Sequence, residues 1–284
     1  MILIRIMTAC LMKDPFAIEN TWNITITGID AERFIQKIKT DDETDYIIDV
    51  SNPPYGTKKI RILIASRVFE ALNDIKENIV IKTPVNLYVI RPGVLDAGNF
   101  AMQKRKYGDF NFEFAIGLPN SQNWPASKEI SHKIQPSSLA LNIYGGTSSY
   151  SLQTTARTIK TVYTYEDESW YKYGKTYAHM YDSSLKNWVR IDTKAYYDSD
   201  AQKGFVTFET NKTGIFTVAD VAALPYDDVK GHWAYKSIYA VASAKRLNSI
   251  KGNKLQPDKN ITVAQAVKLV FDIMEQPSGN DFMN

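Results

Sequence analysis

The sequence is poor in cysteine and histidine. Its 284 residues include one cysteine, Cys10, and three histidines. A single cysteine excludes a disulfide within the chain, so we expect packing to stabilise the fold. His132, His179 and His232 are isolated from one another in the sequence, which gives no case for a catalytic triad, and His232 has no neighbouring cluster at metal-ligand spacing. Paired catalytic carboxylates and phosphate-binding loops are also missing, so the sequence predicts a protein that is not an enzyme and uses no metal or cofactor.

Long apolar runs and a strong net charge are also absent. No stretch approaches the roughly 18 apolar residues that a membrane-spanning helix needs, so no membrane span is predicted. The formal net charge is only +3 and the Lys and Arg residues are scattered, so nucleic acid is not an expected partner. The opening MILIRIMTAC has apolar character, but Arg5 interrupts it and no separate basic segment precedes it, so an export signal is not evident.

Alternation of apolar and polar residues is the main pattern of the N-terminal part. In TWNITITGI, Trp22, Ile24 and Ile26 share one face of a predicted strand. Farther along, an amphipathic helix is predicted behind Ser66, which we expect to cap it, and NIVIKTPVNLYVI returns to the strand period. This order of strand, short helix and strand predicts a small α+β module over residues 1–100.

A β-sandwich-like module is predicted over residues 108–221. Strand patterns such as FNFEFAIGL and KTVYTYE are separated by turn residues at intervals typical of a sandwich. The stretches YDSSLKNWVRID, AQKGFVTFET and NKTGIFTVAD are predicted to form a meander that closes one sheet. The predicted fold class is therefore multidomain and mainly β, with a small α+β unit at the N-terminus and a helical module at the C-terminus.

Helical periodicity replaces the alternation near the C-terminus. A first helix is predicted from about His232 to Ala244, and a second begins where Thr262 and Gln265 have the spacing of a capping box. Val263 lies on the apolar stripe of the second helix. Two helices and a long loop over residues 226–276 bury too little surface to be robust alone, so this unit is expected to need a neighbour.

The same C-terminal residues carry several short motifs. In YDDVKGHWAYKSIYAVASAKRLNSIKGNKLQPDKNITVAQAV, an aromatic-x-Asp-Val opening is followed by His-Trp-Ala, a loop with Gly and Pro, and an Ile-Thr-x-Ala start to the second helix. Together they resemble an S-layer homology module, and GFVTFETNKTGIFTVAD resembles, less specifically, modules that often precede such units in bacterial surface proteins. The resemblance implies an extracellular protein of the bacterial cell surface, attached noncovalently to the cell wall through secondary cell-wall polysaccharide. It also implies that copies usually occur in threes.

The resemblance also suggests where glycan would bind. In the family, the Arg of an Ile-Thr-Arg-Ala-Glu motif is the expected partner of an acidic ketal on the polysaccharide. In this sequence Val263 stands at the Arg position, Gln265 at the acidic position, and Lys245 where a glycine is usual. The bidentate donor is therefore missing, although Gln265 still completes a capping box. The predicted glycan-binding residues are Asp228, Trp233, Lys245, Thr262, Val263 and Gln265.

Each of these residues also has a structural interpretation. A Trp on a helix face of so small a unit is more often a core residue than a sugar platform, so Trp233 is predicted to be core. Asp227 and Asp228 are interpreted as residues of a helix start, and His232 as a capping or surface residue. A basic group near the loop is interpreted as a solvated face or as an attraction for an anionic polymer; it comprises Lys245, Arg246, Lys251 and Lys254.

Three roles therefore remain open at the level of sequence. The first is anchoring at the cell wall, with the β modules as spacers or adhesive surfaces. The second is protein contact by a degenerate module, including self-association or contact with further modules of the same kind. The third is an accessory, noncatalytic part of an extracellular polysaccharide-degrading enzyme whose catalytic domain lies outside this chain.

Overall fold

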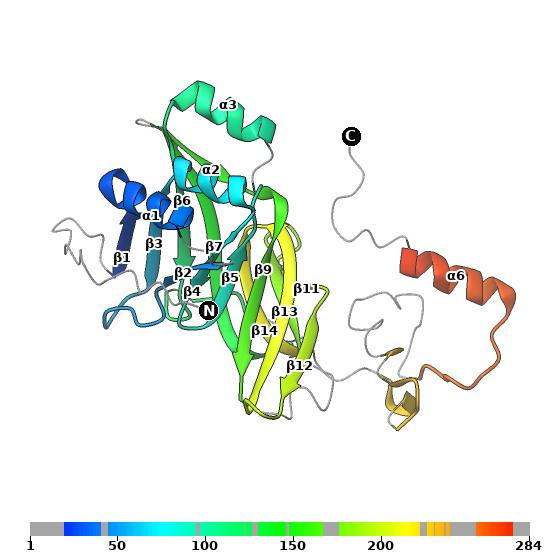
Figure 1. The fold of residues 1–284 in the computed structure, drawn as a ribbon. Helices are drawn as coiled ribbons and strands as arrows, with labels where there is room; N and C mark the ends of the chain where they lie inside the picture. The colour runs from blue at the N-terminus through cyan, green and yellow to red at the C-terminus, as the bar shows by residue number, and fades with distance from the viewer. Residues whose placement is uncertain are drawn as a thin grey trace.

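The protein is mainly β. The computed structural model describes residues 20–40, 45–94, 97–121, 123–126, 130–145, 148–166, 176–221, 226–229, 231–235, 237–238 and 254–274. Figure 1 shows the described strands gathered in one body, with short helices over its upper end and α6 (Val263–Met274) apart from it. The mainly β fold class with a helical segment at the C-terminus, predicted from the sequence, is therefore confirmed. We call the body over residues 21–221 the β unit and the part over residues 226–274 the C-terminal module.

The described strands of the β unit form two sheets. Sheet A has the order β1-β3-β6-β7-β14-β10-β11, with β8 paired to β7, and sheet B has the order β12-β13-β9-β5-β4-β2. Sheet A consists of β1 (Thr21–Ile26), β3 (Lys59–Ala65), β6 (Asn111–Gly117), β7 (Ile130–Gly145), β8 (Ser148–Leu152), β10 (Thr176–Asp182), β11 (Asn187–Arg190) and β14 (Gly214–Val221). Sheet B consists of β2 (Asp45–Asp49), β4 (Asn78–Lys82), β5 (Asn86–Ile90), β9 (Thr154–Tyr165), β12 (Lys194–Asp198) and β13 (Lys203–Lys212).

The two sheets enclose one hydrophobic core. Alternate residues of strands such as β3 and β6 point inward, as the pleat of a strand requires, and side chains of both sheets belong to the same buried cluster. The ring of Phe208 in β13 lies 5.4 Å from the ring of Phe216 in β14, and the Ser137 and Tyr163 hydroxyls of β7 and β9 are 3.1 Å apart. These contacts join sheet A to sheet B, which is the arrangement of a sandwich.

Two helices join the sheets at one end of the sandwich. α1 (Gly28–Thr40) leads from β1 in sheet A to β2 in sheet B, and α2 (Ser66–Ile75) leads from β3 to β4 in the same way. The Phe69 ring of α2 lies 4.7 Å from that of Phe112 in β6, and the Phe34 ring of α1 lies 5.8 Å from that of Tyr46 in β2. The helices therefore share the core of both sheets. β1 and β3 are parallel, and so are β2 and β4.

The boundary expected between residues 1–100 and 108–221 does not separate two bodies. β3 pairs with β6 in sheet A and β5 pairs with β9 in sheet B, so strands from both predicted modules form both sheets. The change of pattern near residue 100 corresponds to a connecting helix, α3 (Ala97–Tyr107). The expectation failed because strand pairing between distant segments leaves no mark on local periodicity.

Local predictions in the β unit have mixed outcomes. Trp22, Ile24 and Ile26 face the core together, as predicted for β1. Ser66 is the first residue of α2 and not its cap, because the N-cap position is Ala65 and no side-chain bond caps the helix. The predicted meander is wrong: β10, β11 and β14 are in sheet A, whereas β13 is in sheet B, so the chain changes sheets between β11 and β12 and again between β13 and β14.

Candidate functional site

Asp228 fixes the loop that precedes α6. It lies in a short 3-10 helix, η1 (Asp227–Val229), in which Val229 is buried, and the preceding residue, Tyr226, is buried as well. Its two carboxylate oxygens accept hydrogen bonds from the backbone N–H groups of Leu255 (2.9 Å) and Gln256 (2.7 Å). The bond from Leu255 is the main reason that the pKa of Asp228 is lowered. Asp228 was expected at a helix start, but it instead holds two segments of the C-terminal module together.

His232 makes a second connection to the same loop. Its Nδ1 accepts a hydrogen bond from the backbone N–H of Ala234 (3.1 Å), and its Nε2 lies 2.9 Å from Oδ1 of Asp258. Because Nδ1 is an acceptor, the ring hydrogen is on Nε2 and is donated to Asp258. Of the two roles predicted for His232, capping or surface, the bond to the Ala234 N–H favours capping, and the bond to Asp258 is an addition that the sequence analysis missed. The feature of the sequence that could have indicated this bond is the pair Pro257-Asp258 in the loop.

The second predicted helix begins with a capping box. The Thr262 hydroxyl accepts a hydrogen bond from the Gln265 N–H (3.2 Å), and the Gln265 side-chain oxygen accepts one from the Thr262 N–H (2.9 Å). These reciprocal bonds satisfy two backbone donors that would otherwise lack partners at the start of α6. The predicted capping box is therefore confirmed, and both side chains are occupied by the backbone.

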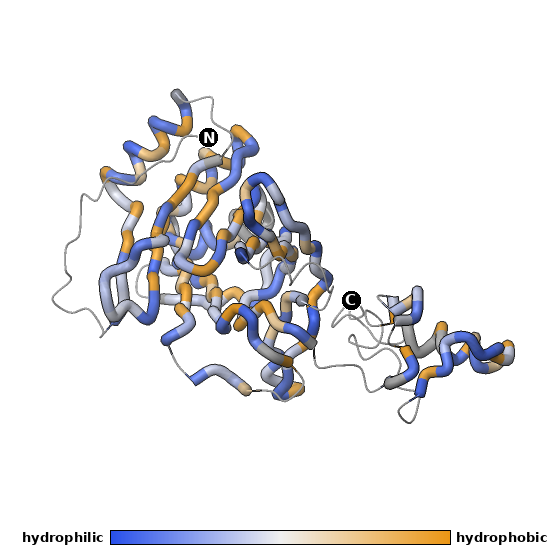
Figure 2. The backbone as a smooth tube through the Cα atoms, turned by 90° about the horizontal axis from the view of Figure 1, so that it is seen from below, coloured by the Kyte–Doolittle hydropathy of each residue, from blue (hydrophilic) through white to orange (hydrophobic). Residues whose placement is uncertain are grey.

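Two apolar groups of the C-terminal module face solvent. Trp233 is 89% exposed, and its ring lies 5.4 Å from that of His232, so the prediction that Trp233 is a core residue is wrong. On α6, the predicted apolar stripe is present, but Val263, Val267 and Val270 are 81%, 48% and 53% exposed. Figure 2 shows the part of the chain that contains this helix well away from the β unit.

The predicted glycan-binding residues thus divide into two kinds. Asp228, Thr262 and Gln265 bond to backbone groups that shape the module, so their described bonds are structural. Trp233 and Val263 are side chains presented to solvent. Lys245 lies outside the described residues, as does most of the predicted first helix. That helix is described only at its start, where the Ile238 N–H donates to the Ala234 carbonyl (2.9 Å).

The β unit brings together two histidines that appear isolated in the sequence. His132 of β7 and His179 of β10 lie on either side of β14, on the face of sheet A that is turned away from the core. The Thr217 hydroxyl of β14 donates to the Ile134 carbonyl (2.6 Å), so His132 Nδ1, 2.8 Å away, donates its own hydrogen to Thr217. Thr217 is therefore not arranged as a nucleophile that gives its proton to His132.

His179 is held as a neutral, buried side chain. It is 2% exposed, and its Nδ1 donates to the Tyr177 carbonyl (3.0 Å). Burial, with smaller contributions from the charges of Arg190 and His132, lowers the pKa of His179 to about 4, although the bond to Tyr177 acts in the opposite direction. Burial also lowers the pKa of His132.

Within the described ranges, no group of three or more His, Cys, Asp or Glu side chains is placed to hold a metal ion. In the same part of the chain, every helix is too short or too polar to cross a membrane.

The comparison with known proteins concerns the C-terminal module. No curated protein matches the chain. Residues 225–267 match a protein-family model, and the matched segment runs from the residue before Tyr226 into α6. It therefore contains Asp228, His232 and the capping box of α6. The family is the S-layer homology domain, so the C-terminal module has the sequence of a domain that indicates association with the bacterial cell surface and cell wall.

Proposed function

We propose that the C-terminal module holds this protein at the bacterial cell wall by noncovalent binding to secondary cell-wall polysaccharide. The match of residues 225–267 to the S-layer homology domain carries the proposal. In this proposal the β unit is a spacer or adhesive surface between the wall and the exterior.

The geometry of the C-terminal module supports binding without a preformed charged pocket. Asp228 and His232 bond to the loop at residues 254–258 and fix it against the start of the module. The exposed Trp233 therefore follows directly after a residue whose position is fixed by hydrogen bonds. An exposed aromatic face is a suitable platform for a sugar ring. Val263 presents an apolar surface where the family has an Arg, so this module offers less attraction to an acidic ketal.

Co-sedimentation with purified cell walls tests the proposal. We expect the intact chain to pellet with walls that carry the secondary polysaccharide and to stay in solution with walls from which it has been stripped. Val263→Arg should strengthen polymer-dependent pelleting, because it restores a bidentate donor at the start of α6. Val267→Arg is the matched control, since it adds the same charge one helical turn away. Equal pelleting with stripped and unstripped walls would contradict the proposal.

Protein contact through α6 is a second candidate function. The observation that favours it is the row of exposed side chains Val263, Val267 and Val270 along one helix face. A helix with such a face commonly buries it against a partner, here a second module of this kind. Analytical ultracentrifugation over a wide concentration range tests this. Concentration-dependent oligomers that Val267→Lys abolishes would support it, and a strictly monomeric chain at high concentration would contradict it.

A further inference from the structure

β12 is an edge strand of sheet B. It pairs with β13 on one side, and among the described residues no strand pairs with its other side. Figure 1 shows β12 as the outermost strand of this sheet, beside β13. The strand contains no proline, and its ladder with β13 has no register shift, so it lacks two features that often protect an edge. Such an edge presents backbone N–H and C=O groups that can pair with a further strand.

The side chains of β12 alternate between two faces. Ala195 and Tyr197 are half-buried and pack against the core of the sandwich. The outer face carries the other three side chains, which are exposed: Lys194, Tyr196 and Asp198. The outer face therefore has a basic residue at one end of the strand, an acidic residue at the other, and an aromatic ring between them.

An antiparallel second copy of β12 can pair with this edge about a two-fold axis at Tyr196. Lys194 of each copy then lies opposite Asp198 of the other, and the small Ala195 lies opposite the larger Tyr197. Opposite charges and aromatic rings that face each other across an antiparallel ladder attract, whereas like charges repel. Because the axis is perpendicular to the sheet, the core faces of both copies stay on the same side. β12 is thus complementary to itself in charge and in side-chain size.

The polar groups that this pairing needs are available. Within the described part of the chain, Lys194 forms no ion pair. Oδ1 of Asp198 accepts hydrogen bonds from two backbone N–H groups of the following turn (both 3.0 Å), which leaves Oδ2 for an amine. The Tyr196 carbonyl accepts a hydrogen bond from the Tyr165 hydroxyl (3.2 Å), and its second lone pair can accept another. The bonds that fix β12 therefore leave these groups free to bond to a copy.

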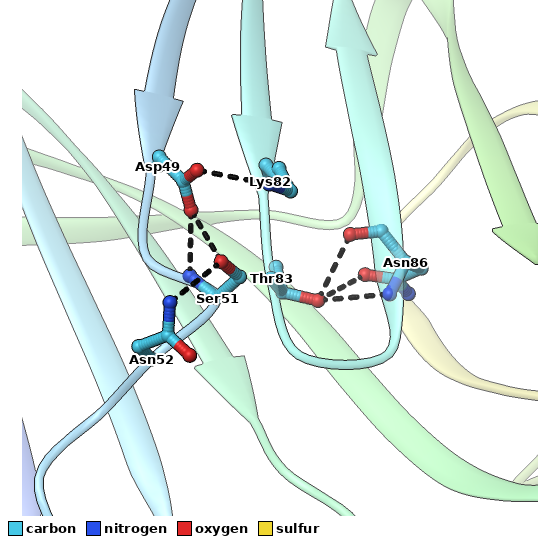
Figure 3. Close-up of polar contacts among 6 residues, drawn as sticks. All are labelled: Asp49, Ser51, Asn52, Lys82, Thr83 and Asn86. Carbon is cyan, nitrogen blue, oxygen red and sulfur yellow. Dashed lines mark hydrogen bonds and ion pairs between the residues drawn. The ribbon is translucent and has the colours of Figure 1, made fainter. Parts of the chain in front are cut away.

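The opposite edge of sheet B has different chemistry. β2 has the sequence DYIID, with an acidic residue at each end, so an antiparallel copy would set like charges against each other. Asp49 at its end already accepts hydrogen bonds from the Ser51 N–H (3.0 Å) and from Lys82 Nζ (3.0 Å) of β4, as Figure 3 shows. The other described edge strands, β1, β8 and β11, carry no pair of opposite charges. Among the described edges, β12 is the one whose charges favour pairing with itself.

We propose that two copies of this chain associate by antiparallel pairing of their β12 strands, which joins sheet B of one copy to sheet B of the other. Ion pairs between Lys194 and Asp198 form at both ends of the new ladder, and the two Tyr196 rings meet at its centre. Strands of five residues bury little surface, and stable complexes bury at least about 1,200 Å², so the association is weak in dilute solution. The contact lies in the β unit and does not depend on the proposed function of the C-terminal module.

Charge exchange at the two ends of β12 tests the proposal in the full chain. All variants also carry Val270→Lys, so that the exposed face of α6 does not contribute. In sedimentation velocity at high protein concentration, Lys194→Glu and Asp198→Lys should each lower the associated fraction several-fold, because each places like charges opposite each other at both ends. An equimolar mixture of these two variants should restore association, because an acidic side chain again faces a basic one at both ends.

The matched control is Lys58→Glu, at an exposed position of the β2–β3 connection. It makes the same change of net charge away from β12, so it should associate as the Val270→Lys chain does. Asp198→Lys also removes an acceptor of the turn after β12. Asp198→Asn keeps an acceptor oxygen there and should lower association less than Asp198→Lys does, with an unchanged thermal unfolding midpoint.

Disulfide trapping tests the register while both charges stay in place. In a Cys10→Ser, Val270→Lys background, Tyr196→Cys should form a disulfide-linked dimer under mild oxidation several-fold faster than Thr164→Cys. Thr164 is exposed and lies in the same row of sheet B, with Phe205 of β13 between it and Tyr196. Residues directly opposite each other in an antiparallel ladder have Cα atoms about 4.5–5.5 Å apart, which a disulfide can span.

Four results would overturn the proposal. The first is a Val270→Lys chain that stays monomeric at high concentration. The second is a mixture of Lys194→Glu and Asp198→Lys that associates no more than either variant alone. The third is a loss of association in Lys58→Glu equal to that in Lys194→Glu, because net charge would then decide the outcome. The fourth is equal rates of disulfide formation by Tyr196→Cys and Thr164→Cys.

Discussion

Acidification should destabilise the β unit through His179. Its pKa is about 4 in the folded protein, against an ordinary value of 6.5. The folded-state pKa is the lower one, so the unfolded chain takes up the proton first as the pH falls. The free energy of unfolding that depends on a neutral His179 is fully present above about pH 6.5, and it is lost progressively as the pH falls from 6.5 to 4. At about 1.4 kcal/mol for each pH unit between the two pKa values, the loss approaches about 3.5 kcal/mol.

Denaturant unfolding followed by tryptophan fluorescence, at pH 7.5 and at pH 4.5, measures this loss. The comparison is made with His179→Gln, which stays neutral and keeps an N–H donor for the Tyr177 carbonyl. Other acidic and basic groups affect both proteins alike, so the difference between them isolates His179. The wild-type chain should lose more stability than His179→Gln, by about 2–3 kcal/mol over this pH range.

Two measurements can refute the destabilisation predicted for His179. If the wild-type chain and His179→Gln have the same pH dependence, or if an NMR titration places the pKa of His179 near 6.5, the buried neutral histidine inferred from the structure is wrong. His132→Gln is a useful second variant, because burial lowers the pKa of His132 in the same direction in a less buried position. Its effect should have the same sign and be smaller.

Three further substitutions test other parts of the fold. Asp228→Ala should speed hydrogen exchange at the Leu255 amide, because it removes the acceptor that fixes the loop; unchanged exchange would show that the carboxylate is not needed. Thr262→Ala should lower the helicity of α6 and cost about 1 kcal/mol, measured by circular dichroism during unfolding, and an unaltered signal would count against the capping box. Gly204→Ala should cost about 1–3 kcal/mol in thermal unfolding, because the new methyl group would meet the ring of Tyr165 on the neighbouring strand, and Tyr165→Leu should recover part of the loss. No recovery would point to another cause.

The two parts of the chain have different sources of stability. The β unit buries rings and aliphatic side chains from both sheets in one cluster, with Phe112, Phe114 and Tyr163 almost wholly buried. The described part of the C-terminal module relies on hydrogen bonds from Asp228, His232 and Thr262, while apolar side chains of α6 remain exposed. This contrast agrees with the expectation that the module needs a neighbour or ligand to bury its apolar surface.

The sequence by itself determined the features that depend on residues a few positions apart. The capping box of Thr262 and Gln265 was predictable because both of its bonds lie within one helical turn. The inward face of β1 was predictable because side chains alternate along a strand. The motifs of the C-terminal module were also local, and the family match confirms them.

Only the tertiary structure decided which distant segments meet. The pairings of β3 with β6 and of β5 with β9 unite two predicted modules. β13 lies in sheet B and not with β10, β11 and β14 in sheet A, which contradicts the predicted meander. The approach of His132 to His179 and the bond of Asp228 to the loop at Leu255 join residues tens of positions apart. The physical reason is that periodicity records which side of an element is buried, whereas the partner that buries it is chosen by packing of the whole chain.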